Sequence, residues 1–195
     1  MNYHEPSTVE EAVALLADEG RCLAGGATLV AMMNARLLEP ETLVSLRRVS
    51  ELEGITAAEG GLRICAMTRH AEVAGSDLFS AGQTIVPSAA ARIGHPAIRS
   101  MGTIGGSISH ADPAADYPTA LTAAAAEIEI AGPDGRRSVS ADDFFEDFFE
   151  TAVDEGELVT AVTIPAAPEG SNAAYDKLVR TDGDFATASV AVVLA

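Results

Sequence analysis

Two glycine pairs in this sequence each lead into a hydroxyl side chain, a combination that suits phosphate binding. The two segments read Ala24-Gly25-Gly26-Ala27-Thr28 and Thr103-Ile104-Gly105-Gly106-Ser107. Glycine accepts positive φ angles and lets the backbone approach a ligand closely, so the N–H groups of such a turn can point at phosphate oxygens, with the hydroxyl as a further donor. Two such turns predict a diphosphate held from two sides, which indicates a dinucleotide.

The spacing of the glycines argues against other glycine-based sites. Neither segment fits the G-x-G-x-x-G pattern of a Rossmann fold, and the chain has no G-x-x-x-x-G-K-[ST] phosphate loop. The run from Gly105 to Ser109 also lacks the last glycine of the G-x-S-x-G nucleophile elbow. The sequence therefore predicts no serine-hydrolase site.

The cysteines and histidines are too few and too scattered for a metal site. Cys22 and Cys65 are the only cysteines, and both lie in apolar segments typical of strands, where a thiol is expected to be buried and structural. Iron–sulfur clusters and zinc ribbons need four ligands. His95 and His110 flank the second glycine pair and are interpreted as structural hydrogen-bonding residues. Any redox chemistry on this chain must therefore be carried by an organic cofactor, with metals on other chains.

Composition predicts a globular, acidic protein. The 195 residues are 48% hydrophobic, enough for a core, and 12 basic against 29 acidic residues give a net charge of −17. That charge argues against nucleic acid or an anionic membrane as a partner and requires backbone donors for any anionic cofactor. Because we find neither a membrane-spanning apolar run nor a signal peptide, we expect a cytoplasmic protein.

Two further features each have a functional and a structural interpretation. Lys177 is the only lysine beside 11 arginines. It could occupy a site that fits a compact ammonium and not a planar guanidinium, or it could simply reflect composition. The acidic run from Asp142 to Glu150 could be a solvated face with buried phenylalanines, or a subunit contact.

Local signals predict a small α+β lobe over residues 1–53. Ser7-Thr8-Val9-Glu10 has the form of a capping box, and apolar spacing then indicates a helix that stops before Gly20. A strand at 21–24, a helix at 28–37 and a strand at 43–46 complete the lobe.

A larger α+β lobe is predicted over residues 54–180. It should begin with a hairpin turning at Glu59-Gly60-Gly61, followed by helices near 69–74 and 84–93 and a helix opened by Pro113 and ending near 126. Strands are predicted at 127–130, 158–164 and 174–180. The apolar run near the end of the sequence is expected to be covered by further sequence that has been lost or by another subunit, since a bare apolar strand promotes aggregation.

Several segments resemble the FAD motifs of the flavoprotein (medium) subunits of molybdenum hydroxylases, most closely the carbon monoxide dehydrogenase type. The first motif corresponds to residues 24–29, followed by Arg36-Leu37, Pro40 and residues 43–46. The second motif corresponds to residues 98–107 and 110–118. Segments 175–180 and 183–186 resemble the part of the family that follows. The resemblance covers nearly the whole chain.

This resemblance implies an α+β, two-lobed FAD-binding fold of the vanillyl-alcohol-oxidase (PCMH-like) kind, with FAD extended between the lobes. Asp116 would bond a ribose or nearby polar group, Val159 would line the cofactor and Lys177 would lie by the isoalloxazine. The diphosphate would be held by Gly25, Gly26, Thr28, Gly105, Gly106 and Ser107, with Ala24, Ala27, Thr103 and Ile104 beside them. Family members continue into a C-terminal α+β domain, so residues 181–195 are expected to begin one whose remainder is missing from this sequence.

The resemblance also implies an oxidoreductase role as an electron-transfer subunit, with no metal and no catalytic acid or base on this chain. A large molybdopterin subunit would act on the substrate, a small iron–sulfur subunit would pass the electrons to FAD, and an external acceptor would receive them. Two alternatives stay open. One is a self-contained flavin oxidoreductase of the same fold, and the other is a scaffold module that has lost the cofactor.

Overall fold

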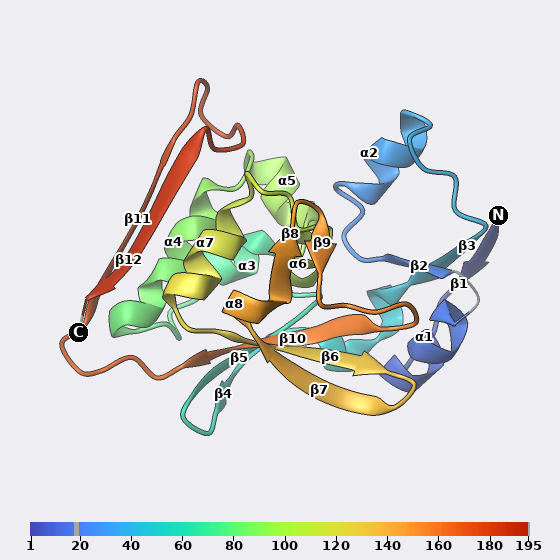
Figure 1. Ribbon diagram of the computed structural model, residues 1–195, viewed down its shortest axis with the longest axis horizontal. Helices are drawn as coiled ribbons and strands as arrows, with labels where there is room; N and C mark the ends of the chain where they lie inside the picture. The colour runs from blue at the N-terminus through green and yellow to red at the C-terminus, as the bar shows by residue number, and fades with distance from the viewer. Residues whose placement is uncertain (18–19, 195) are drawn as a thin grey trace.

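The N-terminal elements form a small parallel sheet with two helices (Figure 1). The computed structural model describes residues 1–17 and 20–194. β3 lies between β1 and β2 and is parallel to both. The elements are β1 (Asn2–His4), α1 (Val9–Leu16), β2 (Gly20–Leu23), α2 (Leu29–Asn34) and β3 (Thr42–Ser45), followed by the 3-10 turns η1 (Leu46–Arg48) and η2 (Ser50–Leu52).

Helix α1 confirms the predicted amphipathic helix, although its cap lies one residue later than expected. Thr8 is the N-cap and accepts a hydrogen bond from the Glu11 N–H at 3.1 Å, while the Glu11 carboxylate accepts from the Ser7 N–H at 2.7 Å. The predicted pair of Ser7 with Glu10 is therefore wrong by one position. The apolar face is buried as its spacing predicts, with Val9, Ala12, Val13 and Leu16 in the core.

A five-stranded antiparallel sheet forms the centre of the molecule, in the order β4-β5-β10-β6-β7. Its strands are β4 (Ile55–Ala58), β5 (Gly61–Cys65), β6 (Glu127–Gly132), β7 (Gly135–Ser140) and β10 (Leu158–Pro165). The hairpin predicted around Gly60 is confirmed, and Gly60 has the positive φ of +78° that the turn needs. The central strand β10 is almost wholly buried, with a bulge between Val159 and Ala161.

A layer of short helices packs on this sheet and closes the main core (Figure 1). Ile64 of β5, Ile104, Ile108 and Tyr117 are fully buried between the two layers. Their burial supplies most of the apolar contact that holds the helices in place. The layer consists of α3 (His70–Ala74), η3 (Ala81–Thr84), α4 (Ile85–Arg92), α5 (Pro96–Met101), α6 (Ile104–His110) and α7 (Asp116–Ala123).

A two-stranded hairpin of β11 (Asn172–Leu178) and β12 (Ala188–Leu194) flanks the helical layer, drawn in red in Figure 1. The apolar run near the end of the sequence thus pairs with β11 of the same chain, a partner that the sequence did not predict. Alternate residues face inward, and Tyr175, Ala191 and Val193 pack against the main core. The opposite face leaves Val190 and Leu194 exposed.

Two predicted helices have different bounds from those expected. α2 covers only Leu29–Asn34, because Arg36 takes a left-handed φ of +56° that ends the helix. The helix expected to open at Pro113 begins at Asp116, because Ala115 is still extended, with φ −71° and ψ 155°.

The acidic run from Asp142 to Glu150 is not one solvated face over buried phenylalanines. It divides into α8 (Ala141–Phe144), β8 (Phe145–Asp147) and the start of β9 (Glu150–Thr151). Phe144 is buried, but Phe148 and Phe149 at the hairpin tip are 72% and 56% exposed. The prediction of buried phenylalanines is therefore wrong for those two residues.

No helix among residues 1–17 and 20–194 combines the length and apolarity that crossing a membrane requires.

Candidate cofactor-binding site

The first glycine pair forms an open turn between β2 and α2. Gly26 has a φ of +77°, a conformation that favours glycine, and the next helix begins at Leu29. Within the described part of the chain, the N–H groups of Gly25, Gly26 and Ala27 donate to no backbone acceptor. Thr28 is exposed at the N-cap position of α2, and its side chain makes no capping bond. The turn therefore presents free backbone donors, as the sequence predicts.

The second glycine pair differs from the expected open turn because it lies in the first turn of α6. Thr103 is the N-cap, and its hydroxyl oxygen accepts from the Gly106 N–H at 3.2 Å. The Ile104 N–H donates to the Thr68 carbonyl at 3.0 Å, and the Gly105 N–H donates to the Ala66 carbonyl at 2.9 Å. These three N–H groups already have protein partners, so the donors left here are the hydroxyl groups of Thr103 and Ser107.

The two glycines of this second pair have different steric roles. A Cβ on Gly105 would lie 2.5 Å from the Ala66 Cβ, so glycine is needed there for α6 to pack on the end of β5. Gly106 is exposed, and a Cβ on it would lie 3.1 Å from the Thr103 hydroxyl oxygen and 3.5 Å from the Ala24 Cβ. Of the two, only Gly106 has an open side that a ligand could approach.

The fold brings the two glycine segments into contact. A Cβ on Gly25 would lie 1.9 Å from the Met101 carbonyl oxygen and 3.0 Å from the Gly102 Cα, and Ala24 neighbours Gly106. In Figure 1 the loop between β2 and α2 turns toward the side of the molecule where α5 and α6 lie. The free donors of the first turn and the open face of Gly106 therefore belong to one surface.

A segment that the sequence gave no reason to select, residues 66–70, supports the second glycine pair. Besides the two carbonyl groups already described, His70 donates its N–H to the Gly102 carbonyl at 3.0 Å, and the Arg69 guanidinium donates to the Ser100 carbonyl. Arg69 also forms an isolated antiparallel bridge with Thr103. This segment fixes the backbone from 100 to 105.

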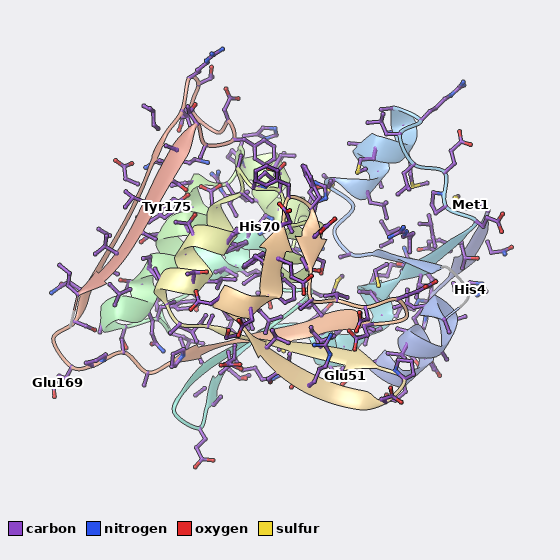
Figure 2. All side chains as sticks on the ribbon, viewed as in Figure 1. Met1, His4, Glu51, His70, Glu169 and Tyr175 are labelled. Atoms are coloured by element: carbon purple, nitrogen blue, oxygen red, sulfur yellow. The ribbon has the colours of Figure 1, made fainter. Side chains whose placement is uncertain are left out.

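His70 is buried beneath that backbone. Its Nδ1 lies 3.2 Å from the Tyr117 hydroxyl, and a Cβ on Gly102 would lie 2.6 Å from its Nε2. Burial, with a smaller contribution from the positive charge of Arg99, lowers the pKa of His70 to about 4, so the ring is neutral at physiological pH. Figure 2 labels His70 in the interior of the molecule, among the helices of this layer.

Asp116 and Lys177 form a buried ion pair. The Lys177 ammonium lies 3.0 Å from the Asp116 carboxylate, and the two side chains are only 1% and 5% exposed. The Tyr175 hydroxyl donates to the same carboxylate at 2.6 Å, and the ammonium also donates to the Asp184 carbonyl at 3.0 Å. Figure 2 labels Tyr175 on the β11–β12 hairpin, which this cluster connects to α7.

Val159 and the cysteines are packing residues in this structure. The Val159 side chain is 4% exposed and belongs to the main core. Cys65 is buried and Cys22 packs against the N-terminal core; both are free thiols, as expected. Burial raises the pKa of the Cys22 thiol to about 12 and also raises that of Cys65, so neither is a reactive thiolate. In the described ranges, no three His, Cys, Asp or Glu side chains come together as a metal site.

Comparison with known proteins identifies the family. The family model described as "FAD binding domain in molybdopterin dehydrogenase" matches residues 1–167. The carbon monoxide dehydrogenase medium chain of Afipia carboxidovorans is 42% identical over 99% of this chain and 68% of its own length. The chain belongs to the FAD-binding medium subunits of molybdenum hydroxylases. Its fold is the α+β FAD-binding fold of that family, and its cofactor is FAD.

Other members of the medium-subunit family show the same extent of similarity. The glyceraldehyde dehydrogenase medium chain of Sulfolobus acidocaldarius is 38% identical over 99% of this chain and 69% of its own length. The structure of carbon monoxide dehydrogenase from Hydrogenophaga pseudoflava superposes with a TM-score of 0.95 at 40% identity, covering 99% of this chain and 68% of that one. These relatives are subunits of oxidoreductase complexes, and so is this chain.

The residues present fit the diphosphate of FAD. The first turn offers three backbone N–H groups without backbone partners, and Gly106 forms an open face that a larger side chain would fill. Backbone and hydroxyl donors suit phosphate oxygens without adding a positive charge. This chemistry agrees with the strongly acidic composition, which leaves few cations to bind an anionic group.

Proposed function

We propose that this chain is the electron-transfer flavoprotein of a molybdopterin-dependent hydroxylase or dehydrogenase. FAD supplies both one-electron and two-electron chemistry when bound. Electrons would arrive from iron–sulfur clusters on a small subunit, after substrate oxidation on a large molybdopterin subunit, and would leave to an external acceptor. We also propose a cytoplasmic location, on the charge and sequence features described above.

The contact between the two glycine segments is the observation that carries this proposal. We propose that FAD extends between a lobe formed by residues 1–53 and a lobe formed by residues 54–180, since Gly25 and Met101 meet where these two parts touch. The backbone N–H groups of Gly25, Gly26 and Ala27 would hold the diphosphate. The hydroxyl groups of Thr28, Thr103 and Ser107 would add donors around it.

The remaining predicted residues have supporting roles in this proposal. Ala24 and Gly106 would leave room for the diphosphate, while Ile104 and Gly105 would hold α6 against the sheet. Val159 would line the cofactor from the core, and the Asp116–Lys177 pair would provide the polar contacts toward the ribityl and isoalloxazine end.

The state of the buried titratable groups favours a transfer subunit over a self-contained flavin oxidoreductase. His70 is neutral and bonded to Tyr117, and Asp116 and Lys177 bind each other. A self-contained enzyme needs a side chain that exchanges protons with its substrate, which these mutually bonded groups are poorly placed to do. An electron-transfer subunit needs only a fixed cofactor near its partner.

Omission of this chain from the complex tests the proposal. With the large and small subunits present, substrate should still reduce the iron–sulfur clusters, but reduction of an external acceptor should be lost and should return when the FAD-loaded chain is added. If the isolated chain oxidises a substrate unaided, the self-contained enzyme is correct. A purified chain that takes up no FAD would instead support the cofactor-free scaffold.

A further inference from the structure

Tyr175 shares its face of β11 with Lys177, because alternate residues of a strand point the same way. Both side chains reach the first residue of α7, Asp116. The Tyr175 hydroxyl is 2.6 Å from one carboxylate oxygen, and the Lys177 ammonium is 3.0 Å from the carboxylate. One carboxylate therefore receives a phenol and an ammonium from the same strand.

The same ammonium also binds the loop that joins β11 to β12, residues 179–187. Lys177 donates to the Asp184 carbonyl at 3.0 Å. The loop is held at two further places, since Ala186 donates its N–H to the Ala114 carbonyl at 3.3 Å and a Cβ on Gly183 would lie 2.9 Å from the Gly94 carbonyl oxygen. The loop is thus folded back against the segments that precede α5 and α7.

We propose that Tyr175 is a positioning residue of the FAD site: its hydroxyl fixes the Asp116 carboxylate, which fixes Lys177 and, through it, the loop 179–187. This inference rests on the proposed function in one respect, that Asp116 and Lys177 face the cofactor. The Lys177 ammonium lies 3.0 Å from both oxygens of the Asp116 carboxylate, and the Tyr175 hydroxyl adds a directional donor to one of them, which restricts rotation of the carboxylate.

The chemistry of Tyr175 suits a permanent donor. Burial, followed by its hydrogen bond to Asp116, raises the pKa of the Tyr175 phenol, so it keeps its proton at physiological pH. Its ring packs against the main core, and a phenylalanine ring would fill the same space. The Tyr175→Phe substitution therefore removes one hydrogen bond and leaves the packing intact.

Two measurements on the full chain test the proposal. The dissociation constant for FAD should rise about tenfold in Tyr175→Phe, the expected effect of losing one hydrogen bond to a charged group. Amide hydrogen exchange in the cofactor-free chain should quicken at Ala186 and Thr187, the loop residues whose N–H groups bond to Ala114 and Leu178. Tyr3→Phe is the matched control, since Tyr3 donates to the Glu5 carboxylate at 3.0 Å in an exposed position.

A double-mutant cycle separates positioning from a general loss of stability. If Tyr175 acts through Asp116, Tyr175→Phe should have little further effect on FAD affinity in an Asp116→Asn background. An undiminished effect there, or wild-type affinity in the single variant, would overturn the proposal. If Asp116→Asn does not fold, the test is the visible circular dichroism of FAD bound to Tyr175→Phe. A changed flavin band at unchanged Tm supports a positioning role for Tyr175, and an unchanged band overturns the proposal.

Failure of the proposed function would look different. A wild-type chain that binds no FAD would disprove the flavoprotein role, while hydrogen exchange would still show whether Tyr175 fixes the loop. Faster exchange in Tyr175→Phe would then support the contact chain from Tyr175 to Asp184, and unchanged exchange would disprove it.

Discussion

Gly25 and Met101 are far apart in the sequence, yet a Cβ on Gly25 would lie 1.9 Å from the Met101 carbonyl oxygen. No shift of a flexible side chain can relieve this contact, because a Cβ is fixed to its own Cα and the Met101 oxygen is a backbone atom. We therefore expect Gly25→Ala to separate the two glycine segments, to destabilise the chain by about 1–3 kcal/mol and to abolish FAD retention. Thermal unfolding and the flavin absorbance of the purified protein measure the two effects.

Gly75→Ala is the matched control for that variant. A Cβ on Gly75 would meet only the Ala71 carbonyl oxygen, at 3.2 Å, and the residue lies at the C-cap of α3. It should keep wild-type FAD content. Full FAD retention in Gly25→Ala would show that the contact is not needed for the site.

Gly106→Val should remove FAD binding while leaving the chain folded. Gly106 is exposed, so a side chain there mainly occupies the space proposed for the diphosphate. By contrast, Gly105→Ala places a Cβ 2.5 Å from the Ala66 Cβ and should lower Tm. Flavin titration and Tm of the two variants check this difference. If Gly106→Val binds FAD as the wild type does, the second glycine pair is not a phosphate site.

The free energy of unfolding should fall between pH 6.5 and pH 4 because of His70. Its pKa is lowered from 6.5 to about 4 in the folded chain, so over this range the unfolded chain binds a proton that the folded chain does not. The free energy of unfolding is therefore highest above pH 6.5. It falls by about 3 kcal/mol in total as the pH drops and the unfolded chain takes up this proton. Urea unfolding across this range measures it.

His70→Gln should flatten that pH dependence, since an amide can still bond to the Tyr117 hydroxyl but does not titrate. His4→Gln, at an exposed position, should keep the wild-type slope. An equal slope in His70→Gln and the wild type would exclude His70 as its source.

Glu129→Gln should lower stability by about 2 kcal/mol, the order expected for hydrogen bonds to a charged group. Its carboxylate accepts from Arg63 at 2.7 Å and from Arg136 at 3.1 Å. Arg136 also donates a hydrogen bond to the carboxylate of Glu51 in η2 at 2.8 Å, so these side chains connect the central sheet to the N-terminal elements. Asp176→Asn is the control, because its ion pair with Arg92 is exposed and should contribute little.

The stabilisation by Glu129 should also be lost as the pH falls, but over a lower pH range than the effect of His70. Burial alone would raise the pKa of Glu129, but hydrogen bonds from Thr160 and the charge of Arg63 outweigh it and the net shift is downward from 4.5. Its stabilisation is present above pH 4.5 and is lost as the pH falls further. Wild type and Glu129→Gln should therefore converge in acid, and a constant difference would contradict this assignment.

The isolated chain should contain neither iron nor molybdenum in stoichiometric amount. Cys22 packs against the core of the N-terminal elements and Cys65 is buried on β5, and burial raises the pKa of both thiols. Elemental analysis measures the content directly, and a chelator should change neither FAD content nor Tm. Stoichiometric iron in the pure chain would overturn the assignment of the metal centres to partner subunits.

Elements with strong local signals could be predicted from the sequence. The spacing of Val9, Ala12 and Leu16 determines α1, and Gly60 determines the β4–β5 hairpin. Helix α6 could not be predicted in this way, because two of its residues, Gly105 and Gly106, are glycines and glycine has a low helix propensity. α6 forms because Gly105 packs on Ala66 and its N–H bonds to the Ala66 carbonyl, a tertiary contact that local spacing does not reveal.

Some residues of the candidate site could likewise be selected from the sequence, and others could not. The glycine pairs and the unusual Lys177 could be selected by residue type, because few side chains suit those positions. His70, Tyr117 and Tyr175 could not, since each acquires its role from a partner distant in the chain. Only the strand alternation that places Tyr175 on the same face as Lys177 gave a signal that could have found one of them.

Lys177 carries the only ε-amino group in this chain, and its side chain is 1% exposed. An acylating reagent therefore reaches this ε-amino group only when the ammonium leaves the Asp116 carboxylate and the Asp184 carbonyl. The mass of the protein after timed labelling thus reports how often this one buried contact opens, without any engineered probe.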